Sequence, residues 1–159
     1  FPLELLPLVI TISALFHACI SYGLLVVALA LLNGSVHGTA LLLPVVLLPF
    51  LAFLLGVGWL LASFGVFFRD ISQLTGLIAT VLLFVSPIFF PLDALPEAFR
   101  PLFLANPLTF VIEQSRGLLI WGTGPDWRAL GFYYLLAFAV AWAGFYAFQR
   151  MRKGFADVI

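Results

Sequence analysis

Charged residues are scarce in this sequence of 159 residues, which has seven basic and seven acidic side chains and a formal net charge of zero. Lysine occurs only at Lys153 and cysteine only at Cys19. A single cysteine excludes a disulfide framework within the sequence and a cysteine pair for a metal. Because no GxxxxGK[ST] run is present, the sequence has no Walker A loop. The zero net charge gives no indication of a nucleic-acid partner.

Apolar residues take the place of the missing charges. They make up 64% of the sequence, and the mean hydropathy of +1.21 lies far outside the range of soluble domains. This composition is typical of a membrane protein. The sequence begins at Phe1 without a basic n-region or a small-residue cleavage site, which argues against a signal peptide. We therefore expect the N-terminal part of a longer protein to be missing.

Four apolar runs are long enough to cross a bilayer, because a span needs about 20 mostly apolar residues. They cover residues 5–32, 41–68, 71–90 and 129–148. The sequence therefore predicts an all-α polytopic membrane protein in which residues 1–159 form one transmembrane domain.

The positions of the basic residues give the expected orientation. Arg150, Arg152 and Lys153 follow the last apolar run, and four spans place them on the same side of the membrane as Arg69. The opposite side carries three arginines, so the margin is one residue. By the positive-inside rule we expect the C-terminus to be cytoplasmic.

The segment between the last two runs, residues 91–127, is too apolar for a free loop but too interrupted to span a membrane. It begins within SPIFFPLDALP, where Ser86 and Pro87 interrupt the helix ladder and predict a kink at Pro87. Asn106 followed by Pro107 is a helix-start signal, because asparagine caps free N–H groups and proline at the first helical position loses no hydrogen bond. We expect a re-entrant or interfacial hairpin that lines or covers a pathway. Its two short helices are predicted at residues 96–104 and 107–120.

Residues capable of chemistry are few and isolated. Glu113 and Arg116 stand three apart on the second short helix, where they form either an exposed ion pair or a polar contact at the mouth of a conduit. His17 and Cys19 lie about 200° apart around a predicted helix and cannot both face one metal. His37 lies in a loop without a second ligand. The sequence therefore predicts no catalytic site, no metal site and no cofactor in this chain.

Four short motifs resemble, in their order and spacing, those of a known family. They are FFRDISQL, SPIFFPLDALP, LANPLTFVIEQSRG and a basic tail that ends in GFADVI. With them the sequence resembles the ABC-2 type export permeases, most closely those that export polysaccharides such as O-antigen, capsule and teichoic acid. The resemblance covers nearly the whole sequence and implies the C-terminal part of a permease with six spans. An N-terminal interfacial helix and the first two spans would be missing.

The resemblance implies a bacterial inner-membrane exporter in which two permease copies pair with cytoplasmic ABC ATPase subunits. ATP and magnesium would be bound by the ATPase, and nucleotide binding would open a path for a lipid-linked glycan. The loop before the third span of such permeases contacts the ATPase, and Phe1, Pro2 and Glu4 stand at this point, where they otherwise form only a span start. Arg69 and Asp70, in the next cytoplasmic loop, either support that contact or pair with each other.

The interrupted run and the hairpin together form the expected gate and translocation path. Aromatic side chains there offer faces on which sugars stack, although lipid contact and packing are the usual roles of phenylalanine. The residues assigned to this path are Ser86, Pro87, Phe89, Phe90, Asn106, Pro107, Phe110, Glu113, Arg116 and Trp121.

We therefore expect a transport subunit without enzymatic activity of its own, which exports lipid-linked polysaccharide and contacts membrane lipid. One alternative is an ABC-2 permease for a drug or another small amphiphile. A second is an ion-coupled carrier or a membrane-embedded enzyme. The predicted spans contain no Asp, Glu, Lys or Arg, which argues against the second alternative because proton relays use such residues.

Overall fold

The computed structural model describes residues 4–34, 36–68, 70–88 and 91–152, and these residues form helices and turns without any β-strand. The all-α prediction is thus confirmed for the part of the chain that is described. In chain order the elements are α1 (Leu5–Asn33), η1 (Gly38–Leu42), α2 (Leu43–Phe67), α3 (Ile71–Phe84), η2 (Leu92–Ala94), α4 (Arg100–Leu104), α5 (Pro107–Arg116), η3 (Gly117–Trp121) and α6 (Trp127–Met151).

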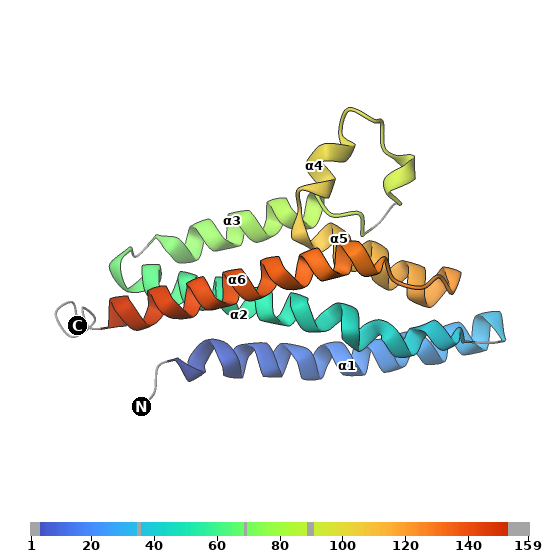
Figure 1. The fold of residues 1–159 in the computed structure, drawn as a ribbon, viewed down its shortest axis with the longest axis horizontal. Helices are drawn as coiled ribbons and strands as arrows, with labels where there is room; N and C mark the ends of the chain where they lie inside the picture. Colours follow the sequence, from blue (N-terminus) through green and yellow to red (C-terminus); the bar gives the residue numbers. More distant parts are fainter. Residues whose placement is uncertain (1–3, 35, 69, 89–90, 153–159) are drawn as a thin grey trace.

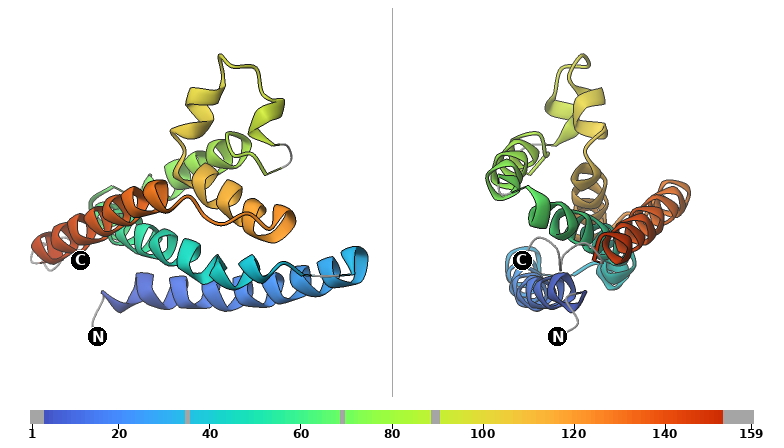
Figure 2. Two further views of the ribbon diagram at one scale, coloured as in Figure 1. Left: turned by 45° about the vertical axis from the view of Figure 1, so that its right-hand side comes forward. Right: turned by 90° about the vertical axis from the view of Figure 1, so that its left-hand side faces the viewer.

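The long helices α1, α2 and α6 run side by side along the length of the molecule (Figure 1). The views in Figure 2 show α2 at the centre, with α1 and α6 packed on it and α3 set apart on another side. Beyond the end of α3, the chain from η2 to α4 projects away from the bundle, and α5 returns it to the start of α6. The first part of the predicted hairpin, up to α4, therefore projects from the bundle, whereas α5 packs on the bundle.

Helices α2 and α6 form the tightest contact in the bundle, and two glycines make it possible. Gly56 of α2 and Gly144 of α6 are both buried, and each lies against the backbone of the other helix. A Cβ atom on Gly56 would lie 2.6 Å from backbone atoms of Val140 and Ala141. Small residues at an interface let helix backbones approach closely, which is a main source of packing energy within a membrane.

Three helices in the described residues are long and apolar enough to span a membrane, namely those at Leu5–Leu32, Gly38–Val66 and Trp127–Met151. They correspond to the first, second and fourth predicted runs. Helix α3 has 14 residues, so it is about 21 Å long and shorter than a hydrocarbon core of about 30 Å. The count of four full spans is therefore not confirmed.

The third run departs from its prediction because the helix stops early. Helix α3 ends at Phe84, and residues 85–88 form turns, so the predicted kink at Pro87 is wrong. Proline disfavours the helical conformation of the residue before it, which here is Ser86. The Ser86 hydroxyl donates a hydrogen bond to the Leu82 carbonyl group, and the Ser86 carbonyl accepts from the Ile88 N–H group.

The two hairpin helices are present with different bounds. Helix α4 begins at Arg100 and not at residue 96, because residues 97–99 form a turn and Pro101 occupies the first helical turn. Helix α5 begins at Pro107 as predicted. It continues from Gly117 as the π-helical turn η3 and ends beside Gly122, whose φ of +65° lies in the left-handed region that favours glycine.

The buried core lies where the hairpin returns to the bundle. It consists of Leu43, Val46, Val111, Leu118, Leu130 and Tyr133. The turn before α2 is tied to this core, because Thr39 Oγ1 donates to the Leu118 carbonyl oxygen at 2.6 Å. Elsewhere the long helices expose large apolar side chains, such as Leu31 and Leu32 at 80% and 82%. Such surfaces fit contact with lipid or with further membrane helices.

Candidate functional site

Asn106 occupies the junction between α4 and α5 and positions both the helix and the hairpin. Its Oδ1 accepts a hydrogen bond from the Leu108 N–H group at 3.0 Å, so its side chain caps α5. Pro107 fills the first helical position, where no hydrogen bond is lost. The predicted start of this helix is confirmed.

The same side chain also binds the end of α3. Asn106 Nδ2 donates to Ser86 Oγ at 2.8 Å and to the carbonyl oxygens of Val85 and Leu82 at 3.1 and 3.3 Å. Asn106 is 5% exposed and Ser86 is 1% exposed. The amide therefore satisfies backbone groups freed by the early end of α3, in a place that water does not reach.

Arg116 makes the second attachment between α5 and the end of α3. One guanidinium nitrogen lies 2.6 Å from Glu113 Oε1, and the other donates to the Pro87 carbonyl oxygen at 2.7 Å. The Arg116 and Glu113 side chains are only 16% and 22% exposed. The contact of Glu113 with Arg116 is therefore part of a tertiary connection and is not a freely exposed helix pair.

Ser86, Pro87, Asn106 and Arg116 together form what we call the hairpin latch. Asn106 at the start of α5 and Arg116 at its end each donate hydrogen bonds to the turns that end α3. A guanidinium and a primary amide each donate to several carbonyl groups, which makes the connection directional. The start and the end of α5 are therefore both joined to the end of α3.

The aromatic residues assigned to the path that the structure describes do not gather at one site. The Phe110 ring packs on Tyr133 of α6 with centroids 5.0 Å apart, so it belongs to the packing against α6. Trp121 is 53% exposed at the end of η3. Phe89 and Phe90 lie outside the described residues. The structure thus joins four of the predicted residues in the latch and Glu113 beside them.

A second cluster forms at the other end of the bundle. Arg152, just after α6, forms an ion pair with Glu4 at 2.8 Å, and we call this contact the terminal ion pair. The Trp59 indole N–H group of α2 donates to the Glu4 carbonyl oxygen at 3.0 Å. Glu4 therefore connects the start of α1 to both α2 and α6. The sequence prediction included Glu4 but missed Arg152 and Trp59, because no local pattern links residues so far apart.

The other residues predicted to contact an ATPase give less information. Asp70 is exposed at the start of α3, and its side chain makes no capping hydrogen bond. Phe1, Pro2 and Arg69 lie outside the described residues. Of the residues assigned to the ATPase contact, Glu4 is therefore the one for which the structure describes a side-chain contact with another helix.

The described residues contain no group of three or more His, Cys, Asp or Glu side chains that could hold a metal ion. Cys19 is exposed on α1, and His17 Nδ1 lies 2.9 Å from the Ser13 carbonyl oxygen. His37 packs against Gly122, which places the turn before α2 beside the end of η3. His17 and His37 therefore have backbone and packing contacts in the helical framework.

Comparison with known proteins gives the family. Residues 4–120 match the family described as ABC-2 type transporter. The chain belongs to this family. An ABC-2 membrane domain is a transport subunit, so the chain is an integral membrane protein of this class, in agreement with its three apolar helices.

The ABC-2 chain is also similar to curated proteins named for polysaccharide export. The O-antigen export system permease protein RfbA of Myxococcus xanthus is 28% identical over 166 residues, which cover 100% of the chain and 62% of that protein. A protein of the same name from Klebsiella pneumoniae is 23% identical over 117 residues, or 74% of the chain and 45% of that protein. The chain thus spans less than two thirds of the length of these relatives.

Proposed function

We propose that the chain is the membrane-spanning part of an ATP-driven exporter that moves lipid-linked polysaccharide across the bacterial cytoplasmic membrane. The similarity of the whole chain to a protein named as an O-antigen export permease carries this proposal. In it, a partner ABC ATPase subunit binds and hydrolyses ATP with Mg²⁺. Two permease copies work together, and the C-terminus is cytoplasmic.

The terminal ion pair provides a route by which the ATPase acts on the bundle. A partner that displaces the start of α1 also displaces α2 through Trp59 and α6 through Arg152. Because α2 and α6 are in backbone contact at Gly56 and Gly144, these two helices respond as one body. Movement at the cytoplasmic end thus becomes a shift of the central helix pair.

The hairpin latch connects the bundle to the hairpin at the C-terminal end of α3, which is the end of the bundle opposite the terminal ion pair. Asn106 and Arg116 keep α5 attached to the end of α3, while Phe110 packs on Tyr133 of α6. When the α2–α6 pair shifts relative to α3, α5 is pulled towards α6 by Phe110 and towards α3 by the hairpin latch. In our proposal this changes the opening through which the glycan leaves.

Transport in proteoliposomes tests this function. The full-length chain is reconstituted with its ABC ATPase partner, and ATP-dependent transfer of a lipid-linked glycan is measured. We expect transfer with the wild-type ATPase and none with an ATPase that lacks its Walker A lysine. Failure to form a complex with any ABC ATPase contradicts the proposal. Transfer of small amphiphiles without transfer of glycan supports the alternative substrate class.

A further inference from the structure

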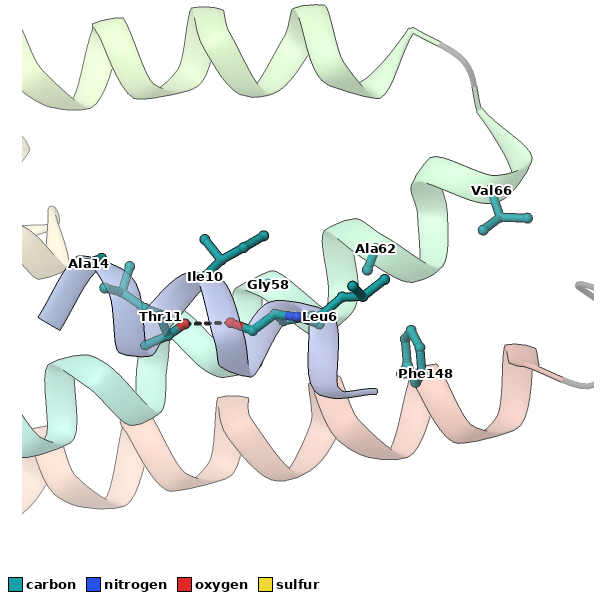
Figure 3. Close-up of a pocket in the computed structure, with 10 residues that line it drawn as sticks. Leu6, Ile10, Thr11, Ala14, Gly58, Ala62, Val66 and Phe148 are labelled. Atoms are coloured by element: carbon teal, nitrogen blue, oxygen red, sulfur yellow. Dashed lines mark hydrogen bonds between the residues drawn. The ribbon is translucent and has the colours of Figure 1, made fainter. Parts of the chain in front are cut away.

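A groove of about 590 Å³ runs between α1 and α2 and ends at α6 (Figure 3). Its lining is almost entirely apolar, and several of its residues are small. The lining residues on α1 include Leu6, Ile10 and Ala14, those on α2 include Gly58 and Ala62, and α6 contributes Phe148. Figure 3 shows Phe148 directed from α6 towards the α1–α2 side of the groove.

The groove offers an occupant no free polar group along its length. Thr11 is the one lining residue with a polar side chain, and its hydroxyl donates to the Pro7 carbonyl oxygen at 2.8 Å. This hydrogen bond is the dashed line in Figure 3. Ile10 is 70% exposed at the groove, so its side chain contacts whatever lies there. The lining therefore fits a hydrocarbon chain.

The length and position of the groove match one leaflet of a bilayer. Along α1 the lining extends from Leu6 to Ala14, which is about 12 Å at a rise of about 1.5 Å per residue. Half of a hydrocarbon core is about 15 Å thick. The groove lies in the half of the bundle that is nearest to the terminal ion pair, since Leu6 follows Glu4 by two residues and Phe148 precedes Arg152 by one helical turn.

Positive charge lies at the polar end of this groove. The Arg152 side chain is 48% exposed although it pairs with Glu4. Arg152 follows the groove residue Phe148 by four positions, so the two side chains share one face of the helix end. An arginine guanidinium binds phosphate through parallel hydrogen bonds, and basic residues beside a membrane attract anionic lipids. An apolar groove that ends beside a half-exposed arginine matches a lipid with a phosphate headgroup.

We propose that the groove binds one anionic phospholipid of the adjoining leaflet. An acyl chain lies between α1 and α2, and the headgroup phosphate contacts Arg152 in competition with Glu4. The site is independent of the exported substrate and goes beyond the proposed transport function. The bound lipid covers the part of α1 that lines the groove, and its phosphate competes with the Glu4 carboxylate for Arg152.

Two substitutions that break the same ion pair test the headgroup contact. Binding of phosphatidylglycerol and phosphatidylcholine to the full-length protein is measured by native mass spectrometry. Arg152→Gln should weaken phosphatidylglycerol binding about fivefold, the loss expected for one basic side chain at an anionic surface. Glu4→Gln removes the competing carboxylate and should strengthen the binding of phosphatidylglycerol. Arg128→Gln is the control, because Arg128 lies at the start of α6, at the opposite end of the helix from Arg152. It should change the binding of neither lipid.

A third substitution tests the acyl-chain contact. Ala62→Leu places a large side chain in the groove and should weaken the binding of both lipids, whereas Ala143→Leu on an exposed part of α6 outside the groove should have no effect. Equal effects of Arg152→Gln and Glu4→Gln would overturn the proposal, because only a structural pair responds alike to both. Equal binding of the two lipids by the wild-type protein would do the same.

A cysteine in the groove identifies the occupant directly. With Ala62→Cys in a Cys19→Ser background, a lipid carrying a thiol-reactive group on its acyl chain should label the protein in membranes, whereas Cys19→Ser alone should stay unlabelled. If the cysteine instead links to a protein segment, of the same chain or of a second copy, the groove is a protein interface and the proposal is wrong.

Discussion

Asn106 Nδ2 donates a hydrogen bond of 2.8 Å to Ser86 Oγ, twenty residues earlier in the chain, while Oδ1 of the same side chain caps α5. One buried amide thus satisfies the start of one helix and the end of another. A hydroxyl has one donor on the same atom that accepts and an aliphatic side chain has neither, whereas the amide has two N–H donors and a separate acceptor oxygen. The connection between the short helix α3 and the hairpin therefore depends on this residue.

Asn106→Ala should destabilise the protein by about 2–4 kcal/mol, because it removes a helix cap and takes the side-chain donor from the Val85 carbonyl group. Asn106→Asp is the informative comparison, since it keeps the capping oxygen and loses the Nδ2 donor. We expect both variants to widen the spin-label distance between α3 and α5, whereas only Asn106→Ala should speed hydrogen exchange at the first turn of α5. Unchanged distances in both would show that Asn106 serves the helix cap alone.

Arg116→Gln should cost about 1–3 kcal/mol, because the Pro87 carbonyl oxygen and the Glu113 carboxylate both lose their charged donor. Glu113→Gln leaves the bond to Pro87 intact and should cost less than half as much. Thermal unfolding in detergent, with each variant compared to the wild-type protein, measures the difference. Equal losses would mean that the ion pair within α5, and not the bond to Pro87, stabilises this region.

Gly144→Ala should separate α2 from α6, since its new methyl group would overlap the Gly56 backbone. We expect a loss of about 1–3 kcal/mol, the usual effect of overpacking. Gly131→Ala on the same helix is the matched control, because no atom of another element lies within 4 Å of its added Cβ. The control should be neutral or stabilising by up to about 1 kcal/mol, as alanine is the better helix former. A similar loss in both variants would contradict close backbone packing at Gly144.

Reversing the terminal ion pair tests its role in coupling. Arg152 is half exposed, so Glu4→Arg or Arg152→Glu should each change stability by less than about 1 kcal/mol. Each should nevertheless raise the amount of ATP hydrolysed per glycan exported, because like charges separate the start of α1 from the end of α6. The double exchange restores opposite charges and should recover the wild-type ratio. If the double variant is as poorly coupled as the single ones, the pair does not transmit movement.

Local sequence signals were sufficient for the features that depend on neighbouring residues. Asn106 and Pro107 predicted the start of α5, and the bounds of α1 and α6 follow the apolar runs within a few residues. The predicted end of the third run was wrong, since the helix stops at Phe84 and not at residue 90. The apolar run continues to Phe90, but Ser86 and Pro87 turn the backbone. The length of the apolar run therefore overestimates the length of the helix.

The sequence by itself determined that this is a helical membrane protein of the ABC-2 class, because composition, run length and motif order are properties of the chain. Only the tertiary structure decided which residues meet. Asn106 with Ser86, Arg116 with Pro87, Gly56 with Gly144 and Glu4 with Arg152 are contacts between distant segments. In a membrane protein, lipid-facing and protein-facing surfaces are equally apolar, so the hydrophobic pattern of a helix does not indicate which face a neighbouring helix covers.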